Sequence, residues 1–72
     1  MDRDVAQRLI EDVVKCHRAL DVANETARSC SDESEQLRIR RALAEASGLL
    51  TAEIIMEIVR VYPELDPYPR PD

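Results

Sequence analysis

Apolar residues recur at alternating intervals of three and four through the first half of the chain. This stripe consists of Ala6, Leu9, Val13, Cys16, Leu20, Ala23, Ala27 and Cys30. Such intervals are typical of one face of a helix that packs against another helix. The pattern predicts a helix from about residue 3 to about residue 29. Asp2 and Asp4 suit its positive N-terminal end, and Arg28 suits its negative C-terminal end.

A short polar segment follows and predicts a turn at about residues 30–32. Asp32 and Glu35 have the spacing of a capping box at the start of a second helix, with Ser31 as the alternative cap. No proline precedes Pro63, so this helix is expected to run from about residue 33 to about residue 62. Pro63 ends it, because proline lacks an amide hydrogen and disfavours helical geometry in the residue before it. We therefore predict an all-α fold, an antiparallel two-helix hairpin over residues 1–62.

The second helix has more apolar surface than one neighbouring helix can cover. In its last part Glu53, Glu57 and Arg60 form one narrow polar stripe, and most of the remaining circumference is apolar. We expect this surplus to pack against a second copy of the chain, which gives a homodimeric four-helix bundle. A different partner protein and a higher oligomer remain alternatives, and a helix lying on a membrane surface is disfavoured by the acidic polar stripe. The expected dimer or partner interface consists of Leu9, Val13, Leu50, Ile54, Ile55, Ile58, Val59 and Tyr62.

The last ten residues, 63–72, contain all four prolines. They predict an extended or irregular tail rather than a further element. Leu65 and Tyr68 are the side chains that would fasten this tail to the bundle. The alternative is that the tail binds a partner, since its spacing of prolines loosely resembles ligands of aromatic-lined grooves.

The two cysteines indicate packing rather than chemistry. On one continuous helix Cys16 and Cys30 would lie roughly 21 Å apart, too far for a disulfide bond. Their place in the apolar stripe predicts reduced, buried side chains and a reducing compartment. The N-terminus lacks the pattern of a signal peptide, and no apolar stretch is long enough to span a bilayer. We therefore expect a cytoplasmic protein with no membrane association.

No motif in the chain predicts catalysis or a cofactor. His17 is the single histidine, and adjacent helical residues point about 100° apart, so His17 and Cys16 of one chain do not form a nucleophile–base pair. Two cysteines and one histidine without paired spacing do not suit structural zinc. Gly48, the single glycine, forms no phosphate-binding loop and marks either close helix packing or a flexible position. We expect no enzyme, no metal and no cofactor.

Charge weighs against nucleic acid as the main partner. The chain has 15 acidic residues against 10 lysines and arginines, a net charge of −5, so it repels phosphate except through a local patch. One candidate patch consists of Arg28, Arg38, Arg40 and Arg41. We predict a small non-enzymatic interaction or regulatory protein that acts as a homodimeric bundle through its acidic helix faces or its tail. An RNA- or DNA-binding hairpin that uses the arginines is the alternative.

Overall fold

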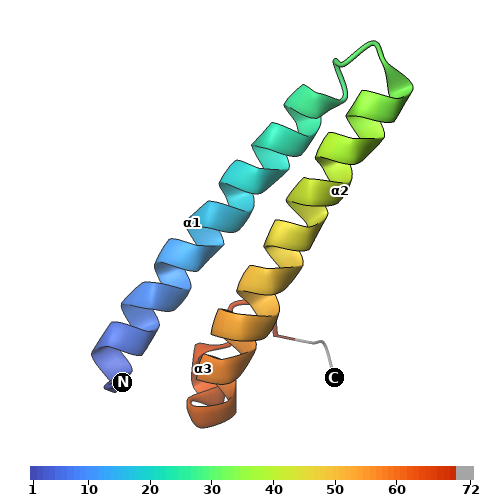
Figure 1. The fold of residues 1–72 in the computed structure, drawn as a ribbon. Helices are drawn as coiled ribbons and strands as arrows, with labels where there is room; N and C mark the ends of the chain where they lie inside the picture. Colours follow the sequence, from blue (N-terminus) through green and yellow to red (C-terminus); the bar gives the residue numbers. More distant parts are fainter. Residues whose placement is uncertain (70–72) are drawn as a thin grey trace.

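Helices form nearly all of the chain, and the computed structural model describes residues 1–69. The elements in order are α1 (Arg3–Ala27), α2 (Glu33–Leu50), the π-helical turn η1 (Thr51–Ile55), α3 (Met56–Val61) and the 3-10 turn η2 (Pro63–Leu65). Helices α1 and α2 run antiparallel, side by side, and the turn joins them at one end of the molecule (Figure 1). The predicted all-α hairpin is therefore confirmed.

Aspartates begin both long helices. The Asp2 carboxylate accepts a hydrogen bond from the Val5 amide (2.9 Å), and the Asp32 carboxylate accepts one from the Glu35 amide (3.0 Å). Each bond satisfies an amide that has no partner inside its helix. The turn between the helices is held from α2, because the Gln36 side-chain amide donates to the carbonyls of residues 28 and 30.

The second half of the chain is helical from Glu33 to Val61, close to the predicted helix over residues 33–62, but its middle is a π-helical turn rather than α-helix. A π-helical turn, η1, separates α2 from α3, and such a turn holds one more residue than an α-helical turn. At its start the Thr51 hydroxyl donates to the Ser47 carbonyl (3.1 Å). The helix ends at Val61. Tyr62 has left the helical region, with φ of −126° and ψ of 75°, because the following proline disfavours helical geometry in the residue before it.

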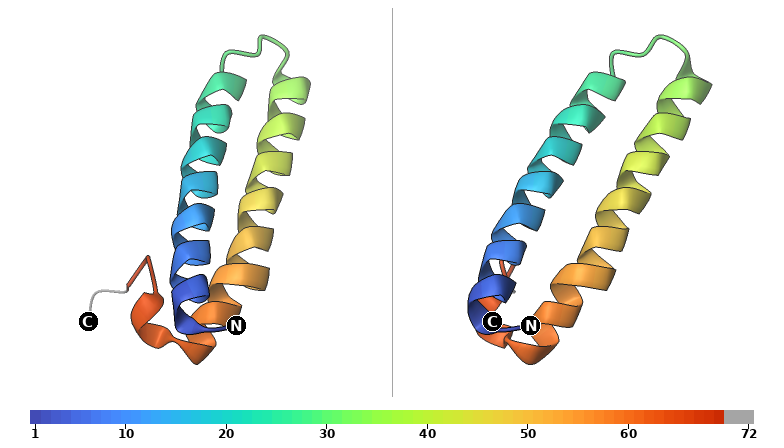
Figure 2. Two further views of the ribbon diagram at one scale, coloured as in Figure 1. Left: turned by 90° about the vertical axis from the view of Figure 1, so that its left-hand side faces the viewer. Right: turned by 60° about the vertical axis from the view of Figure 1, so that its left-hand side comes forward.

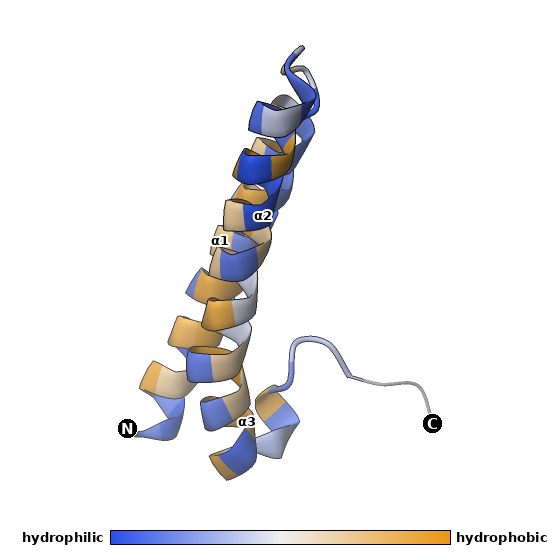
Figure 3. Ribbon diagram, turned by 45° about the vertical axis from the view of Figure 1, so that its right-hand side comes forward, coloured by the Kyte–Doolittle hydropathy of each residue, from blue (hydrophilic) through white to orange (hydrophobic). Residues whose placement is uncertain are grey.

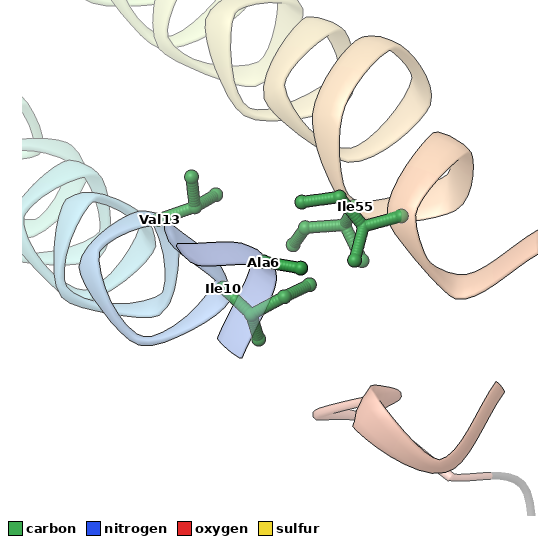
Figure 4. Close-up of a cluster of buried hydrophobic side chains, with 5 residues drawn as sticks. Ala6, Ile10, Val13 and Ile55 are labelled. Carbon is green, nitrogen blue, oxygen red and sulfur yellow. The ribbon is translucent and has the colours of Figure 1, made fainter. Parts of the chain in front are cut away.

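The core lies at the end of the hairpin that is far from the turn. Ala6, Ile10 and Val13 of α1 form a buried cluster with Ile55 and Ile58 of the opposite helix. Figure 4 shows Ile55 facing the α1 members of this cluster. Seven half-buried apolar side chains pack around this cluster: Leu9, Val14, Leu50, Ile54, Val59, Tyr62 and Leu65. The turn half is more polar than this end (Figure 3), and α2 contains no buried residue.

The buried face of α1 differs from the predicted stripe. Ile10 is buried where Leu9 was expected, and Cys16 is exposed. His17 takes the place expected for Cys16, because its Nε2 lies 3.3 Å from the Ser47 carbonyl oxygen of α2. The prediction of a buried Cys16 is therefore wrong. Both spacings fit a helix face, and a hydrogen-bond acceptor on the facing helix favours the imidazole over the thiol.

The tail folds back on the hairpin instead of extending away from it. Pro63–Leu65 forms the 3-10 turn η2, so the prediction of extended or irregular chain is wrong for these three residues. Figure 2 shows η2 beside the N-terminal part of α1, and Leu65 packs against the core cluster. The remainder of the predicted tail, residues 70–72, lies outside the described residues.

Candidate interaction surface

A groove of about 310 Å³ lies open on one side of the apolar end. We call it the open groove, and it is lined by Met1, Leu9, Glu53, Ile54, Glu57, Ile58, Val61 and Tyr62. The Tyr62 hydroxyl donates to the carbonyl of Met1 (3.0 Å), which ties the N-terminus to the end of α3. Glu57 forms an ion pair with Arg60. The open groove therefore has apolar walls with carboxylates at its margin.

The residues predicted for the dimer or partner interface divide into two groups. Val13, Ile55 and Ile58 are buried within the single hairpin, so they form its own core. The half-buried members are Leu9, Leu50, Ile54, Val59 and Tyr62, and three of these, Leu9, Ile54 and Tyr62, line the open groove. The predicted interface thus includes residues of the hairpin core as well as residues of the open groove.

Two apolar groove residues, Met1 and Val61, were missing from that prediction. Val61 is 66% exposed and lies one helical turn beyond Glu57. Its position in the apolar run of the second helix could have identified it as an interface candidate from the sequence. Met1 is held at the groove by the hydrogen bond that its carbonyl accepts from the Tyr62 hydroxyl. No pattern in the sequence predicts that contact.

The hairpin exposes more surface than a compact chain of its size. Its accessible surface is 5567 Å², whereas a compact monomer of 8.2 kDa exposes about 4,500 Å². Its shape is correspondingly elongated, with extents of 45 × 27 × 16 Å. Exposed large apolar side chains contribute to this surface: Met1, Val5, Val22, Leu37, Leu49, Met56, Val61 and Tyr68. The surplus of about 1,000 Å² is comparable to one side of a specific protein interface, which typically buries about 800 Å² per partner.

The other side of the apolar end is partly closed by the tail. There Leu65 and Pro67 face Ile10 and Val14 of α1 across a shallow groove of about 470 Å³, which also includes Lys15. The two sides of the hairpin therefore differ, because one has an intramolecular cover and the other does not.

Tyr68 and His17 join the tail to the middle of α1. Their rings stack with centroids 6.0 Å apart, and the Tyr68 hydroxyl lies 3.1 Å from His17 Nδ1. Since His17 Nε2 faces the carbonyl oxygen of Ser47, Nε2 carries a proton and donates it. In the neutral imidazole, Nδ1 then accepts from the Tyr68 hydroxyl. Leu65 and Tyr68, the two predicted tail contacts, thus both lie against the hairpin.

The four arginines of the candidate nucleic-acid patch are not equally available. Arg28 lies 3.6 Å from a Glu25 carboxylate oxygen, and Arg40 donates through Nε to the Asn24 side chain (3.1 Å). Arg38 and Arg41 are exposed on α2. Two of the four guanidiniums are thus engaged within the hairpin, which weakens the patch as a phosphate-binding surface.

The described residues include free thiols, but no cluster of metal ligands and no helix that could span a membrane. Across residues 1–69, no three histidine, cysteine or acidic side chains come close enough together to hold a metal ion. Cys16 and Cys30 are free thiols, and Cys30, half-buried, lies 3.7 Å from the Asp32 carbonyl oxygen. No helix within the same residues has the length and apolar character needed to cross a bilayer.

Comparisons with known proteins add no family to this description. No protein-family model matches the chain, and neither a curated protein nor a solved structure is significantly similar to it.

Proposed function

We propose that this chain is a small, non-enzymatic interaction module that works as a homodimer. Two hairpins pack with their open grooves facing each other and complete a four-helix bundle. The observation that carries the proposal is the surplus exposed surface of the single hairpin, together with the apolar groove on its uncovered side. A bundle of four helices buries the apolar stripe that two helices leave exposed.

The dimer leaves the polar half of each hairpin available for a further partner. Apolar surface is concentrated far from the turn (Figure 3), so contact between two apolar ends removes the most apolar area from water. The turn halves, which carry Asp32, Glu33 and Glu35, then remain in solvent. Their carboxylates suit a basic protein surface rather than a nucleic-acid backbone.

Two valines provide a matched test of the open groove. Val61 is 66% exposed and lines the groove, whereas Val22 is 67% exposed and lies outside it. We expect Val61→Lys to weaken the dimer and Val22→Lys to leave it unchanged. Burying the exposed part of Val61 contributes about 1 kcal/mol per chain, hence about 2 kcal/mol per dimer. The expected loss of affinity is therefore roughly 30-fold.

Sedimentation equilibrium of the reduced proteins over a wide concentration range measures both effects. The unmodified chain is expected at twice its mass of 8.2 kDa. A chain that stays monomeric throughout would refute the proposal and leave the open groove for a different protein. Equal effects of the two substitutions would show that the dimer, if formed, uses another surface.

A further inference from the structure

The tail covers apolar surface on one side of the apolar end and leaves the other side open to solvent. Residues 63–69, which we call the strap, turn back at Pro63 toward the N-terminal part of α1 (Figure 2). Glu64, Leu65 and Pro67 of the strap line the groove beside Ile10 and Val14, and no strap residue lines the open groove. Leu65 packs against the same cluster as Ile10 and Val14. The strap therefore occupies the place that a third helix would take on this side.

The strap is fastened at three points along α1. At its start Glu64 forms an ion pair with Arg3 (3.2 Å), and both side chains are about half exposed. In its middle, Leu65 supplies the apolar contact. At its end, Tyr68 stacks on His17 and shares a hydrogen bond with it.

The strap is also shaped locally for this path. The Leu65 amide donates to the Tyr62 carbonyl (3.0 Å) and the Asp66 amide to the Pro63 carbonyl (3.3 Å), which closes the 3-10 turn. The Asp66 carboxylate then accepts from the Tyr68 amide (2.9 Å). This bond is an Asx turn, which directs the chain through residue 67 without help from the rest of the protein. The conformation that carries Tyr68 to His17 is thus partly preformed.

The surface beneath the strap has a smaller apolar share than the open groove does, and it is bordered by Gln7, Glu11, Lys15 and Arg18. Ile10 and Val14 line it on α1, with charged side chains at the margin. Without the strap, the hairpin would present apolar surface on both sides. A helical hairpin with two apolar sides continues to add copies, because each added copy leaves a further apolar side uncovered.

We propose that the strap caps this second side and so ends self-assembly at the dimer. The proposal rests on the proposed function, since it assumes that the open groove is the side used by the dimer. The occupant that the strap excludes is a further copy of this chain. The Arg3–Glu64 ion pair and Tyr68 are each about half exposed, so water competes with both contacts and the strap is held weakly enough to be released.

Release of the strap in the full-length chain tests the proposal. We expect the double variant Leu65→Ser/Tyr68→Ser to form species of about twice the mass of the unmodified protein or larger at the same concentration. Pro69→Ser is the matched control, because Pro69 belongs to the strap but is exposed. Mass is measured by sedimentation velocity, and helix content by circular dichroism. A double variant that keeps both the helix content and the mass of the unmodified protein would overturn the proposal.

If the double variant loses helix content, the single variant Tyr68→Ser becomes the test of the proposal. Tyr68 is 51% exposed, so its removal does not open the core. This variant is expected to shift the mass upward at high concentration, and an unchanged mass would refute the strap.

One further variant separates this proposal from the dimer proposal. Val61→Lys, added to the double variant, blocks the open groove while the strapped side stays exposed. If both proposals hold, Val61→Lys alone is mainly monomeric at concentrations below its raised dissociation constant, and the triple variant is a dimer at the same concentrations. If only the strap proposal holds, the unmodified chain is already a monomer and the double variant is a dimer. A triple variant of the same mass as Val61→Lys alone would count against the strap in either case.

Discussion

Ile55 and Ile54 are adjacent in η1 but have different surroundings, and this difference predicts opposite kinds of mutant. Ile55 is 2% exposed and lies among Ala6, Ile10 and Val13 in the core of the single hairpin. Ile54 is half-buried and lines the open groove. We expect Ile55→Ala to weaken the hairpin itself, and Ile54→Ala to act mainly on the association of two hairpins.

The magnitude for Ile55 follows from its burial. Replacement by alanine removes three carbon atoms, which are worth roughly 2.4 kcal/mol in transfer free energy at about 0.8 kcal/mol each. The cavity left behind adds a further term, so measured losses for such substitutions are about 2 to 5 kcal/mol. A chain of this length has a total stability of about 4 to 11 kcal/mol. Ile55→Ala therefore removes a large share of it.

Urea unfolding followed by circular dichroism at several protein concentrations distinguishes the two variants. For Ile55→Ala the free energy of unfolding should fall by about 2 to 4 kcal/mol at every concentration. For Ile54→Ala the loss should be largest where the unmodified protein is dimeric and shrink on dilution. A loss below about 1 kcal/mol for Ile55→Ala, or the same concentration dependence in both variants, would refute this assignment of the two side chains.

Two local features allow further predictions. A Cβ atom built on Gly48 meets no atom within 4 Å, so Gly48→Ala should raise the unfolding free energy by up to about 1 kcal/mol; a loss in the same urea titration would mean that the dimer packs tightly there. Asp32→Ala removes the carboxylate that accepts from the Glu35 amide and should lower the melting temperature, at a cost of about 1 kcal/mol. Asp32→Asn keeps an acceptor and serves as its control, and equal losses in both variants would show that charge rather than the cap is responsible.

The sequence predicted the features that depend on local chemistry. Asp32 and Pro63 bound the second helical region by interactions within a few residues, so their effect can be recognised without knowledge of the fold. The same holds for Asp2 at the start of α1. These local signals, with the apolar periodicity, were sufficient for the hairpin.

Features that depend on the facing helix were not predictable in this way. His17 and Cys16 are neighbours, and either one fits the spacing of the stripe. The choice is made by the Ser47 carbonyl, which lies on α2 and accepts from His17. The apolar periodicity does not reveal the π-helical turn at Thr51–Ile55 either. The additional residue of such a turn shifts the apolar pattern only in the residues that follow it.

The predicted interface combines core and groove residues of the single hairpin for a related reason. In an apolar run such as residues 54–59, hydrophobicity alone does not tell which side chains face α1 and which face solvent. In the structure Ile55 is buried in the core, Ile58 is buried and also lines the open groove, and Ile54 is half-buried and lines the open groove. The distinction needs the rotation of the second helix about its own axis, which is a property of the packed pair.

The absence of any buried residue from α2 gives the hairpin two halves of different rigidity. Near the turn the helices are joined by polar contacts such as the bond between Arg40 and Asn24, and local opening there exposes little apolar surface to water. Backbone amides of the turn half should therefore exchange with solvent through small openings, while those around Ile10 and Ile55 exchange only when the whole hairpin unfolds. The turn half is thus the part of the hairpin that changes shape at the lowest energetic cost, while the apolar end keeps the chain folded.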